Sequence, residues 1–206
     1  EEDWANEWKK YFNPIEIGKK LAICPTWETY DNPDGRTVMK IDPGMAFGTG
    51  GHATTRLCLE TLEQYITPQT ELLDLGCGSG ILSIAALLLG ASRTVGIDID
   101  SLAVKTAREN GALNGFAPPR YVIEQGNLAD RVAGQFDVVV ANIVADVIAF
   151  FCPQVRAFMK PGAVFVTSGI IDTREPDVRA AFAANGLQIQ ARHESGGWLS
   201  FVCTAI

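Results

Sequence analysis

Between residues 71 and 168 the chain alternates two kinds of apolar pattern. Short continuous apolar runs alternate with longer stretches whose apolar residues recur at helical spacing. The runs predict strands at 72–75, 94–97, 121–124, 136–141 and 163–168, and the stretches predict helices at 81–89, 101–113 and 146–159. Continuous apolar strands separated by helices are typical of a parallel sheet covered on both faces. The sequence therefore predicts an α/β protein with a doubly wound sheet.

The C-terminal part predicts a different arrangement. A helix is expected at 176–185, ending before Gly186, and two strand runs at 187–192 and 198–203 flank Gly196-Gly197. A glycine pair between two such runs is typical of an antiparallel hairpin. With this hairpin closing its edge, the predicted sheet has seven strands, is mostly parallel and is Rossmann-like.

The N-terminal part predicts smaller elements. Residues 1–12 are expected to form a helix that carries Trp4 and Trp8 one turn apart, and Asn13-Pro14 ends it. A surface helix that packs two rings on the core is favoured over a ligand site. Two short strands are expected next, at 21–25 and 37–41, with a turn at 31–35 between them.

A glycine-rich loop at 42–52 leads into the next predicted helix. Thr54 or Thr55 is expected to cap this helix, because a threonine hydroxyl can accept a hydrogen bond from a backbone N–H of the first turn. The helix itself is indicated by apolar residues that favour helical spacing: Leu57, Leu59, Leu62 and Tyr65.

Composition limits the class of protein. The 206 residues, 47% hydrophobic and 20% charged, suit one globular domain. A formal net charge of −7 with no Lys/Arg cluster disfavours a nucleic-acid partner. Five scattered cysteines without metal spacing favour a reducing, cytoplasmic location, and no metal is expected. The longest mostly apolar stretch, 81–91, is about half of a membrane span, and the first residues lack signal-peptide features, so we expect a soluble protein.

The run Asp74-Leu75-Gly76-Cys77-Gly78-Ser79-Gly80 lies between a predicted strand and a predicted helix. Gly76 allows a sharp turn, Gly78 allows a ligand to approach the backbone, and Gly80 allows the new helix to pack closely. Asp98 ends the next strand, 22 residues after Gly76. That spacing is typical of a carboxylate that binds the hydroxyls of a ribose.

The glycine pattern also discriminates between nucleotides. A dinucleotide fingerprint requires glycine where this chain has Ile81. S-adenosylmethionine carries an amino-acid carboxylate and an ammonium group in place of a diphosphate, and a loop with Asp74 at its entry suits that zwitterion. We therefore expect S-adenosylmethionine as the cofactor; the alternative is a tight strand–helix turn that binds no ligand.

Four segments together resemble one family. Residues 42–55 read DPGMAFGTGGHATT and resemble the DPGxAFGTGxHxTT signature of the ribosomal protein L11 methyltransferases (PrmA). The opening run at 3–12, the loop at 74–80 and the run ANIVAD at 141–146 are similar to that family as well, so the resemblance extends over essentially the whole chain. Val144 stands where the family has leucine.

The resemblance implies a set of site residues. Thr55, Gly76, Asp98 and Asn142 would contact S-adenosylmethionine, and Phe47 and Thr49 would lie in the loop that covers it. Asn127-Leu128, after the third strand of the sheet, would hold the adenine. The alternative is that 116–120 is an insertion, which would shift the alignment with the family at these two residues.

The resemblance also implies an organisation into domains. Residues 1–14 would be a linker helix and 15–206 the methyltransferase domain, without the family's N-terminal substrate-recognition domain. On that basis we expect cofactor binding to be retained and methylation of the ribosomal protein to be weak.

Asn142 is the candidate catalytic residue. It follows a central strand, at the edge where open α/β sheets place their sites, and its carboxamide can accept an N–H from a neutral amine. The alternative is an asparagine that only caps the strand. Asp146 is expected either to attract the ammonium form or to cap a helix. His52 is expected to be a structural loop residue rather than a base.

These features predict a protein N-methyltransferase acting on lysine side chains or the α-amine of ribosomal protein L11. The nearest alternative is a related methyltransferase that acts on another protein or on a small molecule. A binding or scaffolding domain without activity is disfavoured by the intact Asn142 and glycine loop, and a dehydrogenase by Ile81.

Overall fold

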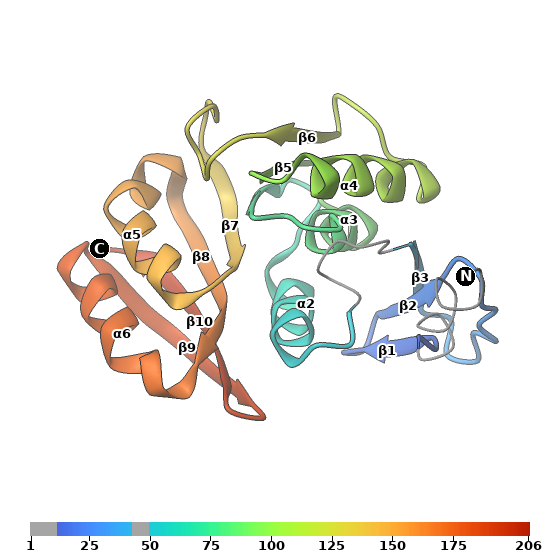
Figure 1. Cartoon of the computed structure of the whole chain (residues 1–206), viewed down its shortest axis with the longest axis horizontal. Helices are drawn as coiled ribbons and strands as arrows, with labels where there is room; N and C mark the ends of the chain where they lie inside the picture. The colour runs from blue at the N-terminus through green and yellow to red at the C-terminus, as the bar shows by residue number, and fades with distance from the viewer. Residues whose placement is uncertain (1–11, 43–49) are drawn as a thin grey trace, which may run out of the picture.

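The computed structural model describes residues 12–42 and 50–206, and its centre is a seven-stranded sheet (Figure 1). The strand order is β6-β5-β4-β7-β8-β10-β9. Strands β6, β5, β4, β7 and β8 are parallel, and β10 is antiparallel to both β8 and β9. The strands span Glu71–Leu75 (β4), Arg93–Asp98 (β5), Tyr121–Gln125 (β6), Phe136–Asn142 (β7), Met159–Ile171 (β8), Leu187–Ser195 (β9) and Trp198–Ala205 (β10). The predicted sheet, including its C-terminal hairpin, is confirmed.

Helices cover both faces of this sheet, as predicted. They are α2 (Ala53–Tyr65), α3 (Ile81–Leu88), α4 (Ser101–Leu113), α5 (Ala145–Val155) and α6 (Glu175–Ala184). Figure 1 shows α2, α3 and α4 on one side of the central strands and α5 and α6 on the other. Each face of the sheet therefore has its own hydrophobic core, one with α2, α3 and α4 and the other with α5 and α6. Side chains of β7 alternate between them: Val138 and Val140 belong to the core of α2, α3 and α4, and Val139 belongs to the core of α5 and α6.

The helix predicted at 146–159 is too long. Helix α5 ends at Val155, a 3₁₀ turn follows at Arg156–Phe158, and Met159 already pairs with Phe136 of β7. The apolar spacing fits either structure at these positions. Pairing with the neighbouring strand decides it, together with Pro161, which disfavours helix for the residue before it.

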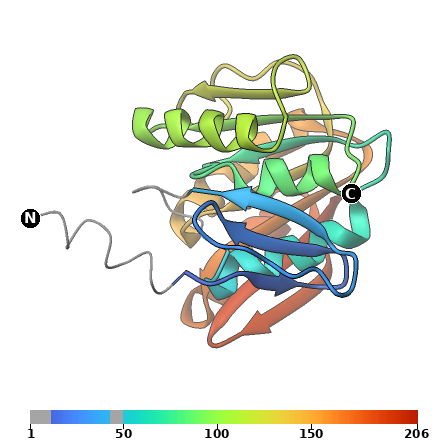
Figure 2. The ribbon, with the colours of Figure 1, turned by 90° about the vertical axis from the view of Figure 1, so that its right-hand side faces the viewer.

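A separate three-stranded sheet, β1-β2-β3, was not predicted as a unit. It comprises β1 (Ile15–Ile17), β2 (Leu21–Pro25) and β3 (Thr37–Ile41); β2 pairs antiparallel with β1 and parallel with β3. The two strands expected at 21–25 and 37–41 are confirmed, and β1 is added. Figure 2 shows this small sheet in front of α2 and α3. Ile17, Ile23 and Met39 belong to the same core as those helices.

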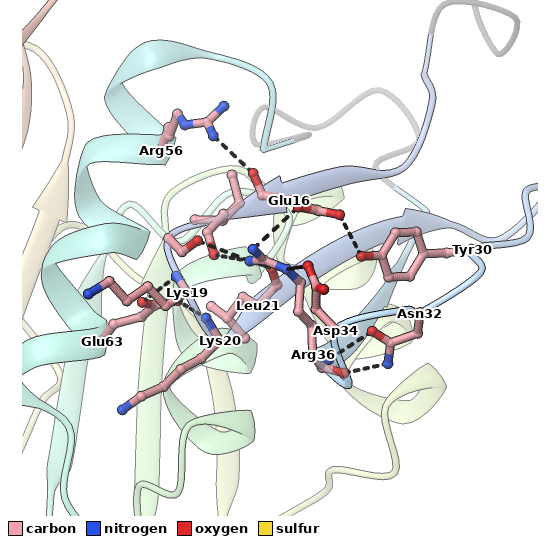
Figure 3. Close-up of polar contacts among 12 residues, drawn as sticks. Glu16, Lys19, Lys20, Leu21, Tyr30, Asn32, Asp34, Arg36, Arg56 and Glu63 are labelled. Atoms are coloured by element: carbon pink, nitrogen blue, oxygen red, sulfur yellow. Dashed lines mark hydrogen bonds and ion pairs between the residues drawn. The ribbon is translucent and has the colours of Figure 1, made fainter.

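Polar contacts attach the small sheet to α2 (Figure 3). The Glu63 carboxylate accepts hydrogen bonds from the backbone N–H groups of Lys19 and Lys20, each at 2.9 Å. Arg56 donates to the backbone carbonyl of Glu16 at 2.9 Å. Since β3 pairs with β2 in this sheet, the contacts hold the sheet that precedes the glycine-rich loop on the helix that follows it.

The described residues contain no helix long and apolar enough to cross a membrane. Within the same residues, no group of three or more His, Cys, Asp or Glu side chains could hold a metal ion. All five cysteines are buried and free.

Candidate functional site

The loop between β4 and α3 has the backbone conformation that its glycines allow. Gly76, Gly78 and Gly80 have φ values of 70°, 54° and 81°, a left-handed region that other residues rarely adopt. The N–H groups of Gly76 and Cys77 donate to the Ile97 carbonyl, at 2.8 and 3.0 Å. A Cβ on Gly80 would clash with the Tyr121 hydroxyl of β6, which confirms the close packing predicted for this glycine.

Asp98 lies at the end of β5, beside this loop. One of its carboxylate oxygens accepts the Gly78 N–H at 2.8 Å, and the other accepts the Asp100 N–H at 3.0 Å. These two bonds orient the carboxylate, and each oxygen keeps a further lone pair for a ligand hydroxyl. The prediction that Asp98 ends this strand is confirmed.

A pocket of ≈480 Å³ opens at this edge, where β4, β5, β6 and β7 end. Its volume is typical of small-molecule sites. Six of the predicted site residues line it: Gly76, Gly78, Asp98, Asn127, Leu128 and Asn142. Phe47 and Thr49 lie outside the described residues. Sequence reasoning missed six further lining residues: Ile97, Ile99, Gly126, Ile143, Val144 and Val147.

Most of the missed residues are apolar and adjoin predicted ones in sequence. Ile97 and Ile99 flank Asp98, and Ile143 and Val144 follow Asn142. An apolar residue at a strand end resembles any core residue in sequence, so only its position next to a predicted polar site residue could have indicated its role.

Leu128 is strained. Its φ of 50° lies in the left-handed region, and it is the one non-glycine residue of the described chain in that region. A branched side chain there costs about 1–2 kcal/mol, and such strain concentrates at binding sites. Leu128 lines the pocket together with Gly126 and Asn127.

Asn142 and Thr55 form a pair between β7 and α2. The Asn142 Nδ2 donates to the Thr55 Oγ1 at 3.3 Å. Thr55 is fully buried and does not itself line the pocket. The described residues supply no hydrogen bond to the Asn142 Oδ1, so this oxygen remains an acceptor at the pocket wall.

The predicted cap of α2 is wrong. His52 is the N-cap, and its Nδ1 accepts the Thr54 N–H at 3.3 Å and lies 2.8 Å from the Thr54 hydroxyl. Thr54 and Thr55 are inside the helix, because the helical backbone begins at Ala53. The His52 ring also packs edge-on against Trp198, with centroids 5.1 Å apart. These contacts support the structural interpretation of His52.

Asp146 is not a helix cap. Val144 holds the N-cap position of α5 without a side-chain hydrogen bond, and Asp146 lies in the first turn. Two nitrogens of the Arg174 guanidinium donate to its carboxylate, and these hydrogen bonds lower the pKa of Asp146. The charge expected to attract an ammonium ion is thus paired with Arg174.

Asp74 is buried beneath the glycine loop and does not line the pocket. Its carboxylate accepts hydrogen bonds from the Ser83 N–H at 3.2 Å and the Ser83 hydroxyl at 2.8 Å. Burial raises the pKa of Asp74 to about 7, against the lowering effect of the Ser83 bonds. Asp74 was expected to suit the ammonium group of S-adenosylmethionine, but its buried carboxylate is not at the wall of the pocket.

Comparison with known proteins connects this site to a family. Residues 1–205 match the family model described as Ribosomal protein L11 methyltransferase (PrmA). A Ribosomal protein L11 methyltransferase of Pelotomaculum thermopropionicum is 48% identical over 200 residues, which cover 97% of this chain and 65% of that relative. The chain thus spans slightly less than two thirds of that relative's length.

Solved structures agree with the sequence match. The crystal structure of ribosomal protein L11 methylase from Lactobacillus delbrueckii subsp. bulgaricus has a TM-score of 0.89 and 33% identity, covering 94% of this chain and 99% of that chain. An RNA methyltransferase from Salinibacter ruber in complex with S-adenosyl-L-homocysteine has a TM-score of 0.57 and 25% identity, covering 71% and 88%. The family match and the shared fold lead to one conclusion: this chain belongs to the ribosomal protein L11 methyltransferase (PrmA) family.

Proposed function

We propose that this chain binds S-adenosylmethionine in the pocket at the carboxyl edge of the sheet and transfers its methyl group to amino groups of ribosomal protein L11. The observation that carries this proposal is the convergence of the predicted site residues. Gly76, Asp98, Leu128 and Asn142 come from four separate segments and line one pocket. Family membership and the names of the relatives support the reaction and the substrate.

The residues of the pocket fit the cofactor. The Asp98 carboxylate, held by two backbone N–H groups, suits the two ribose hydroxyls. Apolar side chains of Ile97, Ile99 and Leu128 suit the faces of an adenine ring. Gly76 and Gly78 let the backbone approach the amino-acid part of the ligand.

The cofactor would supply an electrophilic methyl group, so the protein's task is to align a neutral amine with it. A lysine with a pKa of about 10.4 is only roughly 0.1% neutral near pH 7.4, which costs about 4 kcal/mol, whereas an α-amino group of pKa about 7.8 costs well under 1 kcal/mol. Desolvation in the pocket lowers the pKa of the amine and offsets part of this cost.

In this proposal Asn142 is the catalytic residue. Its Nδ2 donates to the Thr55 hydroxyl, and this bond orients the carboxamide at the wall of the pocket. The Oδ1 oxygen accepts an N–H of the neutral amine and orients the nitrogen lone pair. Such a role requires position rather than proton affinity, which agrees with a site that lacks a neighbouring strong base among its described lining residues.

Three further assignments belong to the proposal. Residues 15–206 form the methyltransferase domain. The protein works in the cytoplasm, for which the five free, buried cysteines are the supporting observation. Its partner is the L11 protein itself rather than nucleic acid, in keeping with the net charge of −7.

Two measurements test the proposal. In calorimetry, S-adenosylmethionine and its demethylated product should bind and NAD should not; at a hundredfold excess over the dissociation constant, the ligand should raise the free energy of unfolding by about 2.7 kcal/mol. With labelled cofactor, purified L11 should become methylated on amines. A preference for NAD would refute the cofactor assignment. Binding of S-adenosylmethionine with transfer only to another protein or a small molecule would refute the substrate.

A further inference from the structure

Helix α4 is packed tightly beside the glycine loop. A Cβ on Gly111 would clash with the Tyr121 ring, and a Cβ on Gly80 would clash with the Tyr121 hydroxyl. That hydroxyl donates to the Ala107 carbonyl of α4 at 2.7 Å. The helix therefore has little freedom to move relative to β6 and the loop, and a side chain on its inner face has a defined position.

Asn110 lies on that inner face and is fully buried. Its Nδ2 donates to the Ser79 carbonyl in the glycine loop at 3.0 Å. Its Oδ1 accepts the Asp42 N–H at 2.8 Å. An amide suits a backbone carbonyl on one side and a backbone N–H on the other, because it is both donor and acceptor at any pH. One side chain thus joins two loops that lie far apart in the sequence.

Asn114, the C-cap of α4 one turn further on, bonds to strand β3 and, among the described residues, not to either loop. Its Nδ2 donates to the Lys40 carbonyl at 2.7 Å and its Oδ1 accepts the Lys40 N–H at 3.0 Å. It also donates to the Asn110 carbonyl at 2.8 Å. Asn114 therefore holds the end of β3 on α4, and its hydrogen bonds to described residues do not reach the glycine loop.

We propose that Asn110 is a positioning residue for cofactor binding: it holds the glycine loop, through Ser79, in register with Asp42, where the second glycine-rich segment begins. Asn110 is not among the residues that line the pocket, so it acts through the loop. The assignment of its consequence to S-adenosylmethionine rests on the proposed function; the link between the two loops does not.

The test compares Asn110→Asp with Asn114→Asp, which place the same charge one turn apart. Aspartate at 110 can still accept from Asp42, but when ionised it cannot donate to the Ser79 carbonyl. We expect the dissociation constant for S-adenosylhomocysteine, measured by calorimetry at pH 8, to rise about tenfold or more in Asn110→Asp. It should recover as the pH falls, because a protonated carboxyl donates again. Asn114→Asp should keep the native affinity.

A second readout needs no cofactor. Cys77 lies in the glycine loop and is buried. Its rate of alkylation, followed by peptide mass spectrometry, should rise at least severalfold in Asn110→Asp and stay native in Asn114→Asp. If the two variants lose thermal stability alike while cofactor affinity and Cys77 alkylation stay native, Asn110 only supports the fold and the proposal is wrong.

Two controls keep the outcome clear. If Asn110→Asp does not fold, Asn110→Ser and Asn114→Ser give the same comparison without added charge. If the native protein binds neither S-adenosylmethionine nor its product, the proposed function fails, and the Cys77 comparison still decides whether Asn110 joins the two loops.

Discussion

The two edges of the central sheet, where the parallel strands begin and where they end, use polar and charged side chains in opposite ways. At the amino edge, Lys160 lies 2.8 Å from Glu71 and 2.9 Å from Asp137, and Asp137 also accepts the Glu71 N–H at 2.8 Å. These charges satisfy one another. At the carboxyl edge, Asp98 accepts a hydrogen bond from the Gly78 N–H and Asn142 donates one to the Thr55 hydroxyl, and both residues line a pocket. The comparison shows that polar side chains at strand ends are paired with one another at the amino edge of this sheet and line a pocket at its carboxyl edge.

The largest expected effect concerns Asp74, which is buried on β4 between the two edges. Its pKa of about 7 lies above the usual value of 3.8, so the folded state keeps a proton that the unfolded state loses between these pH values. Asp74 should therefore make the free energy of unfolding fall as the pH rises from 4 to 7, by up to about 4 kcal/mol.

Asp74→Asn should remove this dependence. Chemical denaturation of the native protein and the variant at pH 4.5 and 8 measures it, and the variant should be the more stable at pH 8. Parallel pH profiles for the two proteins would show that Asp74 does not titrate in this range.

Next in size is the effect of Asn142→Ala on turnover. Without the carboxamide the amine loses its orienting acceptor, and misalignment of this kind costs about a hundredfold in rate. The turnover number should fall more than the affinity for cofactor, as separate saturation and calorimetric measurements would show. Thr55→Val, which removes only the bond to Asn142, should give a smaller loss in the same direction. A Thr55→Val variant with native turnover would mean that the 3.3 Å contact does not position Asn142.

Asp98→Ala should weaken the binding of S-adenosylmethionine about tenfold to a hundredfold. The substitution removes charge-assisted hydrogen bonds worth roughly 1.5–3 kcal/mol. Calorimetry gives the dissociation constant, and circular dichroism checks that the fold is retained. Asp137→Ala at the opposite edge is the matched control and should leave the dissociation constant unchanged. Equal losses in both variants would contradict the difference between the edges.

The smallest effect is expected for Lys160→Met at the amino edge. Glu71 and Asp137 raise the pKa of Lys160 through hydrogen bonds, but all three side chains are about one third exposed. Removing the ammonium group should cost about 1 kcal/mol or less in free energy of unfolding, and the difference should shrink at high salt. Thermal unfolding at two salt concentrations measures it. A change in cofactor affinity would show that the two edges are coupled.

Local patterns accounted for most of the elements and for the polar part of the site. The strand–glycine loop–helix unit at 71–88 follows from continuous apolar residues, three glycines at fixed spacing and an apolar helix, all within one short segment. Asp98 is predicted from its place at a strand end 22 residues after Gly76, Asn142 from its place after a central strand, and both from the family resemblance; parallel strands bring such ends to one edge. Phe47, Thr49 and the helix expected at 1–12 stay predictions.

Contacts between segments distant in sequence decided the features that local patterns did not predict. The sequence alone determined the doubly wound sheet and most of its elements, and it indicated the residues proposed to bind the cofactor, because apolar periodicity and glycine spacing are local properties. Only the tertiary structure decided that His52 caps α2, that Asp146 pairs with Arg174, that α5 ends at Val155, and that β1, β2 and β3 form a second sheet on α2. In each case two conformations are locally acceptable, and the choice depends on a partner remote in sequence: Trp198 for His52, Arg174 for Asp146, Phe136 for Met159 and Glu63 for the turn at Lys19.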